Sequence, residues 1–375
     1  MNKLKLMTVL GTRPEIIRLS AVMRCADRYL THLVVHTGQN YDPALNEVFF
    51  QELGLRPPDF YLDAVGADLG ETMGNIIARS YQVMLREKPD AVLILGDTNS
   101  ALCAISAKRL KIPIFHMEAG NRCWDWNVSE MINRKIVDHI SDINLPYTEN
   151  SRRYLLSEGI DGKTIFVTGS PMREVLEAAM PQIERSDVLQ RLELERGKYI
   201  LVSAHREENI DIERNFLSLM QAINQMAEAY QLPVIYSTHP RSLKFIRQRN
   251  FTFHPLVRSL PPFGFFDYNH LQMNSLVVLS DSGTLSEESA MLGFCGVLIR
   301  TSTERPEVLD KGTVVIGGIT QDSVQQAAEL AIAMQRAGEP RAMPGDYADT
   351  NVSAKVVKLI QSYTPIVNQT VWLKR

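Results

Sequence analysis

Short apolar segments recur along the chain, separated by helical or polar stretches of similar length. In the first half they are Leu4–Leu10, Leu33–Val35, Ala91–Leu95, Ile112–Met117, Ile143–Leu145 and Ile165–Val167. In the second half they are Tyr199–Val202, Val234–Tyr236, Leu276–Leu279, Val297–Ile299 and Val314–Ile316. These segments are continuously apolar, as in strands buried on both faces of a parallel sheet. The pattern predicts right-handed strand–helix–strand units in both halves.

Two of these units resemble each other. Residues 91–116 align without a gap with residues 275–300, which places Asp97 opposite Asp281. In each unit a strand ends in an aspartate and a hydroxyl residue, and a helix and another strand follow. Identity is low and such units generally look alike, but the match favours two domains of one architecture.

The length of 375 residues also favours two domains, because it exceeds what one hydrophobic core usually supports. We expect an α/β protein with two Rossmann-like, doubly wound domains that face a cleft. The first domain is predicted at residues 1–170 and the second at 199–360, joined by a charged, helical connection at 171–198. A helix is expected over Val352–Ser362, and the tail at 361–375 is expected to cross back to the first domain.

Composition narrows the class of protein. The chain is 45% apolar and carries 40 basic and 43 acidic residues, without the basic excess that nucleic-acid binding requires. The four cysteines are scattered, as expected of reduced thiols in a cytosolic protein. Arg13 and Glu15 follow the first apolar segment, and none of these segments approaches the ~20 residues of a membrane helix. We expect a cytoplasmic protein with no signal peptide, membrane segment or nucleic-acid partner.

Polar clusters follow most of the apolar segments. They read GTRPE at 11–15, GQN at 38–40, GDTNS at 96–100, HMEAGNR at 116–122, SAHREEN at 203–209, STHPR at 237–241 and DSGTLSEES at 281–289. In parallel sheets, ligands bind beyond the carboxyl ends of the strands. The clusters are therefore the candidate site.

Phosphate binding is indicated by the cluster at 281–289, which begins a predicted helix. The amides of Ser282, Gly283 and Thr284 would face an anion at the positive end of the helix dipole. Thr284 and Glu287 also match a capping box, and capping and phosphate binding can coexist.

Three arginines follow apolar segments, where a cation suits a phosphate or a carboxylate. They are Arg13, Arg206 and Arg241, and their convergence on one cleft is the functional alternative to simple solvation.

Acid and base catalysis is indicated by three carboxylates, Asp97, Glu118 and Glu130. Asp97 or Thr98 could instead cap a helix. Glu130 shares a predicted helix face with Arg134, which fits either a surface ion pair or a positioned acid. If the three carboxylates gather, like-charge crowding is expected to raise the pKa of at least one.

Motifs for other chemistries are absent from the sequence. It contains no GxGxxG, no GxxxxGK[ST] and no GxSxG. His116, His205 and His239 come from three separate strands and lack metal-ligand spacing. We expect no cofactor and no metal, and His205 is either a proton shuttle or a structural histidine.

Taken together, these motifs resemble the non-hydrolysing UDP-N-acetylglucosamine 2-epimerase family. GTRPEII, GDTNS, HMEAGNR, EMINR, SAHRE, LSDSGTLSEE and TERPE stand in the family's order over nearly the whole chain. TGQNYD, INRKIVDHISD, SAHREEN, FGFFDYNHLQ and LSDSGTLSEES are most similar to the UDP-N-acetyl-L-fucosamine synthase branch. That branch converts UDP-2-acetamido-2,6-dideoxy-L-talose into its L-fuco epimer for surface polysaccharides. UDP-N-acetylglucosamine is the alternative substrate.

The resemblance implies a glycosyltransferase-B-like fold, a homodimer, and a UDP-N-acetylamino sugar and UDP as ligands, without a cofactor or metal. It makes Asp97, Glu118 and Glu130 the catalytic carboxylates and His205 the active-site histidine. It implies substrate or UDP contacts for Arg13, Arg18, Gln39, Arg134, Arg206, His239, Phe263, Ser282, Gly283, Thr284, Glu288 and Arg305. Within this set, Glu288 is implied to bind the ribose hydroxyls.

The departures from the family pattern are small. Many relatives have Lys at Arg18, Gly at Thr284 and Pro-Glu-Glu at residues 129–131. Alignment on Asn133 and Arg134 retains Glu130 as the first of those glutamates. Met131 stands in place of the second glutamate, so how the start of this helix is capped stays an open question.

The implied chemistry needs no redox step. The C2 hydrogen of an acetamido sugar has no neighbouring carbonyl, so the C1–O bond must break before a carboxylate can remove the C2 proton. This explains several carboxylates in one site. A UDP-sugar glycosyltransferase, with a single base, and a non-catalytic nucleotide-sugar-binding protein are the rival hypotheses.

Overall fold

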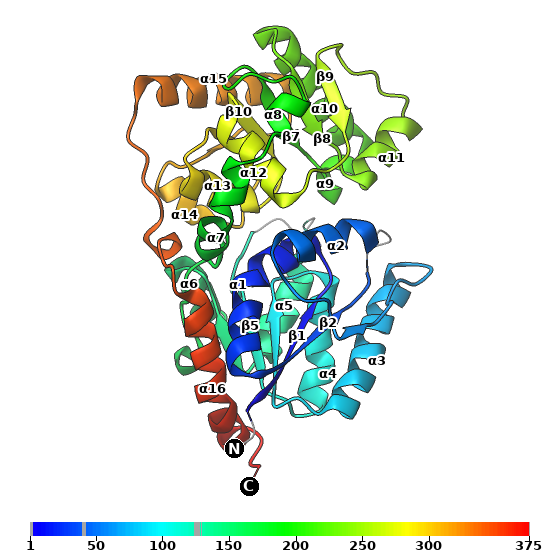
Figure 1. Ribbon diagram of the computed structural model, residues 1–375, viewed down its shortest axis with the longest axis vertical. Helices are drawn as coiled ribbons and strands as arrows, with labels where there is room; N and C mark the ends of the chain where they lie inside the picture. The colour runs from blue at the N-terminus through cyan, green and yellow to red at the C-terminus, as the bar shows by residue number, and fades with distance from the viewer. Residues whose placement is uncertain (1–2, 40–42, 124–127, 129, 375) are drawn as a thin grey trace. The chain divides into compact units, whose positions relative to one another are not determined.

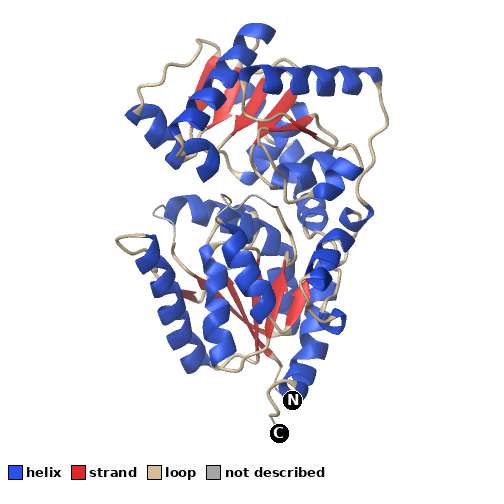
Figure 2. Ribbon diagram, turned by 180° about the vertical axis from the view of Figure 1, so that it is seen from behind, coloured by secondary structure: helices blue, strands red, loops and turns tan. Residues whose placement is uncertain are grey.

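The computed structural model describes residues 3–39, 43–123, 128 and 130–374. The chain divides into two compact units. The first comprises residues 1–122, 129–178 and 345–375, and the second comprises residues 123–128 and 179–344. Each unit contains a six-stranded sheet (Figure 2). The predicted α/β class with two Rossmann-like domains is confirmed.

The sheet of the first unit is parallel, with strand order β3-β2-β1-β4-β5-β6. The strands are β1 Lys5–Leu10, β2 Thr31–His36, β3 Phe60–Tyr61, β4 Ala91–Leu95, β5 Ile114–Met117 and β6 Ile143–Leu145. The main helices are α1 Arg13–Tyr29, α2 Pro43–Glu52, α3 Leu69–Glu87, α4 Cys103–Arg109, α5 Glu130–Ile140, α6 Glu149–Ser157, α7 Met172–Glu184 and α16 Val352–Thr370 (Figure 1). The last residues of α7 belong to the second unit.

The second unit repeats this topology, with strand order β12-β11-β10-β7-β8-β9. The strands are β7 Ile200–Ser203, β8 Val234–Ser237, β9 Val257–Leu260, β10 Val277–Ser280, β11 Gly296–Leu298 and β12 Val315–Ile316. The helices are α8 Val188–Arg191, α9 Glu207–Ile210, α10 Glu213–Tyr230, α11 Pro240–Gln248, α12 Phe265–Asn274, α13 Thr284–Leu292, α14 Pro306–Asp310 and α15 Gln321–Ala337.

The two sheets agree with the internal sequence alignment. β4 pairs with β1 in the first sheet, and β10 pairs with β7 in the second, so both occupy the same place beside the first strand of their unit. Asp97 and Asp281 therefore follow equivalent strands, at the carboxyl edge where ligands of this fold class bind.

The apolar pattern did not predict two short strands, and one strand that it predicted is not formed. β3 has two residues, and β9 is only partly buried, so neither reads as a continuous apolar run. The predicted segment Ile165–Val167 makes only a single bridge, between Asn144 and Ile165. Its residues after Ile165 are partly exposed.

The C-terminal helix α16 belongs as a whole to the first unit. It continues past the predicted end at Ser362 to Thr370, and the domain boundary expected at residue 360 falls inside it. Val356, Ile360 and Val367 are buried along its length, and the helix packs beside α1. No helix among the described residues combines the length and hydropathy needed to cross a bilayer. All four cysteines are free thiols.

Candidate active site

A tight turn follows β5 in the first unit and presents Glu118. Glu118 adopts a φ of 59°, in the left-handed region that residues with a Cβ seldom occupy, and Gly120 follows with a φ of 78°. The Glu118 side chain is buried. A non-glycine residue keeps such a conformation only when its surroundings hold it, and such residues concentrate at functional sites.

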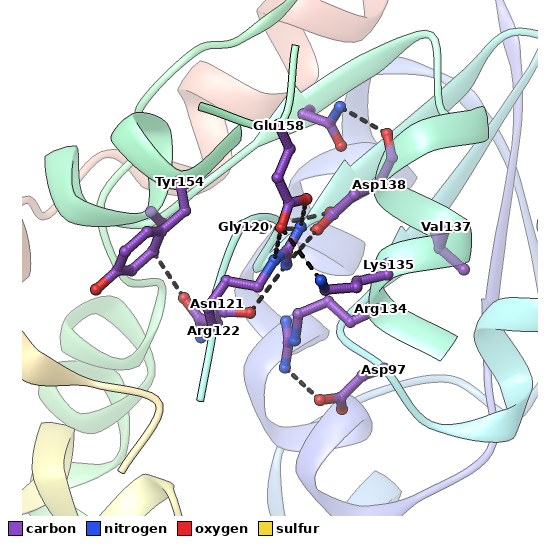
Figure 3. A network of polar contacts seen from close by, with 12 residues as sticks. Asp97, Gly120, Asn121, Arg122, Arg134, Lys135, Val137, Asp138, Tyr154 and Glu158 are labelled. Atoms are coloured by element: carbon purple, nitrogen blue, oxygen red, sulfur yellow. Dashed lines mark hydrogen bonds and ion pairs between the residues drawn. The ribbon is translucent and has the colours of Figure 1, made fainter. Parts of the chain in front are cut away.

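Two arginines hold this glutamate. Arg134 on α5 lies with Nη2 3.3 Å from Oε1 of Glu118, and it also donates to the Glu118 backbone oxygen. Arg18 on α1 pairs with Oε2 of Glu118. Arg134 forms a further ion pair with Asp97, which follows β4 (Figure 3). We call these four residues the carboxylate–arginine cluster. Its positive charges offset the repulsion between two carboxylates held in one place.

The turn after β4 shows which of Asp97 and Thr98 caps the helix that follows. Thr98, not Asp97, caps the short 3₁₀ helix at 99–102, through a hydrogen bond of 3.3 Å from the Ser100 amide. Asn133 donates to the Asp97 backbone oxygen at 3.0 Å. The Asp97 carboxylate is thus directed to Arg134 by contacts from the same helix.

Glu130 is the first residue of α5, one helical turn before Arg134. It is partly buried. The structure therefore places all three predicted catalytic carboxylates in the first unit, and a single helix carries Glu130, Asn133 and Arg134.

Glu15 is a buried carboxylate in the candidate cluster at 11–15 to which the sequence analysis assigned no role. Its Oε2 accepts hydrogen bonds from the Gly11 amide at 3.1 Å and the Thr12 hydroxyl at 2.8 Å. Burial raises the pKa of Glu15 from 4.5 to about 7. Crowding of the other carboxylates was expected to raise a pKa, but here the cause is desolvation. The available signal was the spacing T-x-x-E at the start of a helix.

The remaining predicted contacts of the first unit lie near this helix start. The Arg13 guanidinium stacks over the Phe49 ring, 5.8 Å from its centroid. Gln39 follows β2, and its Nε2 would lie 3.2 Å from a Cβ added to Gly11. A side chain at position 11 would also collide with Thr37 and Ser100. The glycine is therefore required by close packing.

In the second unit, Asp281 organises the turn that carries His205. Its carboxylate accepts from the His205 and Arg206 amides, both at 2.9 Å, and from Nδ2 of Asn209 at 3.1 Å. The His205 ring is partly exposed and lies beside the His239 ring, with 5.5 Å between centroids and a tilt of 35°. Asp281 thus fixes the backbone beside the predicted proton shuttle.

The start of α13 has the features of an anion site. A Cβ on Gly283 would lie 3.8 Å from Nε of Arg305 and 4.0 Å from Nη2 of Arg206. Two guanidiniums therefore lie near the helix N-terminus, where Ser282 and Thr284 flank the glycine, and both features favour a phosphate.

The predicted capping box at this helix is wrong. Gly283 occupies the N-cap position and makes no side-chain cap. Glu287 instead forms an ion pair with Arg305 at 3.1 Å. The Glu287 carboxylate, which the local pattern predicted to accept from a backbone amide at the helix start, is therefore paired with a guanidinium from another segment.

The convergence of Arg13, Arg206 and Arg241 on one cleft stays a prediction. Arg241 forms ion pairs with Glu207 at 2.5 Å and Asp211 at 3.2 Å. Arg13 belongs to the first unit. Arg305 is the arginine that accompanies Arg206 at α13.

Three further predicted contacts belong to the second unit. Glu288 is buried and accepts from Nε2 of Gln272 at 2.6 Å, which orients its carboxylate. His239 caps α11, where its Nδ1 accepts from the Arg241 amide at 3.2 Å. Phe263 is partly buried just before α12. Gln272 is a second residue that the sequence analysis did not single out.

A family model described as UDP-N-acetylglucosamine 2-epimerase matches residues 24–361. The chain belongs to the UDP-N-acetylglucosamine 2-epimerase family. This confirms the predicted non-hydrolysing epimerase family, and the protein is an enzyme of the isomerase class.

Solved and curated members of the epimerase family cover nearly the whole chain. The structure of UDP-N-acetylglucosamine 2-epimerase from Rickettsia bellii is 42% identical over all of both chains, with a TM-score of 0.91. The Methanocaldococcus jannaschii enzyme in complex with UDP-GlcNAc and UDP is 30% identical over 96% of this chain and 100% of that one, with a TM-score of 0.90. UDP-2,3-diacetamido-2,3-dideoxy-D-glucuronate 2-epimerase of Pseudomonas aeruginosa is 31% identical over 95% of this chain and 100% of its own.

Proposed function

We propose that this epimerase converts UDP-2-acetamido-2,6-dideoxy-L-talose into UDP-N-acetyl-L-fucosamine, by eliminating UDP and adding it back. The observation that carries the chemistry is the contact of Arg134 with both Asp97 and Glu118. One guanidinium thus holds two carboxylates in one place, as a base and an acid that act on the same carbon require.

Elimination begins with cleavage of the C1–O bond, whose electron pair leaves with UDP. Arg206, Arg305 and the N-terminus of α13 would stabilise the charge that develops on the departing diphosphate. The electron-deficient C1 acidifies C2, and a carboxylate takes the C2 proton to give a 2-acetamidoglycal. No oxidant or reductant is consumed.

Re-addition completes the inversion. A second acid delivers a proton to the opposite face of C2, and UDP attacks C1 to restore the glycosidic bond. Asp97, Glu118 and Glu130 are the proposed acids and bases, and His205 is a proposed proton shuttle. Glu288, held by Gln272, is proposed to accept the ribose hydroxyls.

The choice of sugar rests on motif resemblance to the L-fucosamine branch. UDP-N-acetylglucosamine is the second candidate, favoured by the names of the Rickettsia bellii and Methanocaldococcus jannaschii relatives. The named Pseudomonas aeruginosa relative acts on a third acetamido sugar, so family membership leaves the sugar open. A panel of these three UDP-sugars, assayed at equal concentration, compares the candidates directly through kcat/KM.

Deuterium incorporation separates the proposed epimerase from a glycosyltransferase. In D2O, an epimerase places deuterium at C2 of the recovered UDP-sugar without any acceptor. Release of UDP that depends on an acceptor, with no deuterium at C2, would contradict the proposal. The measurement is proton NMR of the C2 position together with the mass of the recovered UDP-sugar.

The proposal includes a cytoplasmic homodimer, as the family resemblance implies. The described helices include no membrane-spanning candidate. Sedimentation equilibrium of the purified chain tests the dimer, and cell fractionation tests the compartment.

A further inference from the structure

Asp138 is a buried carboxylate on α5 that the proposed reaction does not use. Its side chain is 0% exposed, and three groups from the segment 116–122 contact it, two of which, Gly120 and Arg122, are labelled in Figure 3. The Gly120 amide donates to Oδ2 at 3.1 Å, Nη1 of Arg122 donates to the same oxygen at 2.7 Å, and Nδ1 of His116 lies 2.9 Å from Oδ1. These contacts fall on both sides of Glu118.

These contacts stabilise the ionised form of the buried Asp138 carboxylate. Burial by itself would raise the pKa of Asp138, but His116, Arg122 and Arg134 together hold it below its ordinary value. Arg122 is itself fixed by Glu158, through bonds of 2.9 Å from Nε and 2.6 Å from Nη2. A carboxylate with several charge-assisted partners holds its neighbours rigidly.

The same carboxylate reaches the turn of Asp97 through His116. Nε2 of His116 lies 2.7 Å from the backbone oxygen of Gly96, the residue before Asp97. A carbonyl oxygen only accepts, so Nε2 donates this hydrogen bond. Asp138 is therefore connected to the backbone of both strand-end turns, after β4 and after β5.

We propose that Asp138 is a positioning residue that holds Asp97 and Glu118 in reactive geometry. The inference rests on the proposed epimerase function and assigns Asp138 no contact with the substrate. Arg134, one helical turn earlier on α5, orients the two carboxylates, and Asp138 holds the turns that present them. The left-handed backbone of Glu118 needs such support, because a strained turn relaxes when its contacts are lost.

The test compares Asp138→Asn with Asp142→Asn. Asp142 is also buried, and it holds the opposite end of β5 by accepting from the Ile114 amide at 2.9 Å and pairing with Lys108 at 2.6 Å. Both changes remove a buried carboxylate at β5, so both should lower thermal stability. The asparagine at 138 would present an uncharged amide to the Gly120 and Arg122 donors.

Asp138→Asn is expected to lower kcat about 100-fold, because displacement of reacting groups by about 1 Å costs that much. KM and the Kd for UDP should stay within about twofold of wild type, and C2 deuterium exchange should fall with kcat. Asp142→Asn should keep wild-type kcat. An equal loss of kcat in both variants, or wild-type kcat in Asp138→Asn, overturns the inference.

A second variant covers the case in which Asp138→Asn does not fold. His116→Gln leaves Asp138 paired with Arg122 but removes the ring that connects it to the Asp97 turn. We expect a loss of kcat of about tenfold at unchanged KM, and wild-type kcat would overturn the inference. Wild type is run in parallel: absence of C2 exchange there refutes the proposed function, whereas exchange that survives in the variants refutes only the role of Asp138.

Discussion

Arg134 is joined to Glu118 twice. Its guanidinium lies 3.3 Å from the side-chain Oε1 and also donates to the backbone oxygen of the same residue. One planar group thus fixes both the position of the glutamate backbone and the direction of its carboxylate. A lysine ammonium is a single point of charge and cannot reproduce this fork.

We therefore expect Arg134→Lys to lower kcat about 100-fold, with a smaller change in KM, because the reacting carboxylates lose their geometry. Steady-state epimerisation assays measure both constants. Arg173→Lys is the matched control, since Arg173 forms a surface ion pair with Glu177 at 2.6 Å. If the kcat of Arg134→Lys stays within threefold of wild type, a positive charge at position 134 is enough for activity and the fork of the guanidinium is not needed.

Glu118→Gln tests the proton transfer itself. An amide cannot take the C2 proton at neutral pH, so C2 deuterium exchange should fall at least about 100-fold. The UDP contacts proposed for α13 belong to the second unit, so the Kd for UDP should be unchanged. Circular dichroism checks the fold, because Arg18 loses the carboxylate with which it pairs. Exchange at the wild-type rate would remove Glu118 from the mechanism.

Gly283→Ala tests the anion site at α13. The added methyl group would make ordinary contacts of 3.8 and 4.0 Å with Arg305 and Arg206, so the fold should tolerate it. It would occupy space beside both guanidiniums, and we expect the Kd for UDP to rise about tenfold, equivalent to about 1.4 kcal/mol.

Calorimetric titration with UDP measures this effect. Gly345→Ala is the control, because a Cβ there meets no atom within 4 Å. Equal affinities for UDP in the two variants would argue against a diphosphate at α13.

Glu15 makes stability depend on pH in a direction opposite to that of most carboxylates. Its pKa is about 7 in the folded chain, above the ordinary value of 4.5 for a glutamate. Between these values the unfolded chain releases the proton that the folded chain retains, so stability falls as pH rises. The loss contributed by this group is up to about 3 kcal/mol, since each pKa unit corresponds to about 1.4 kcal/mol.

Glu15→Gln does not titrate and should therefore gain stability relative to wild type as pH rises from 4.5 to 7.5. Urea unfolding of both proteins at the two pH values measures the difference, and contributions from other titrating groups cancel between them. A difference that is independent of pH would show that Glu15 titrates normally.

The apolar pattern predicted most of the strands correctly because each strand that is buried on both faces is a continuous apolar run in the sequence. β4 and β6 begin and end where their apolar runs do, since both faces of each strand are covered. β9 gave no such run, because its residues are only partly buried at the edge of the second sheet. Whether a strand lies at the edge depends on the order of strands in the sheet, which cannot be predicted from the residues of that strand alone.

By itself, the sequence determined the two repeated α/β units and, through the order of its motifs, the epimerase family. Those properties depend on local periodicity and on short segments. Only the tertiary structure joined Arg134 to Asp97 and Glu118, paired Glu287 with Arg305 in place of a helix cap, and placed Asp138 against the turn that presents Glu118. Ion pairing and desolvation depend on distances and burial that residues far apart in sequence create together.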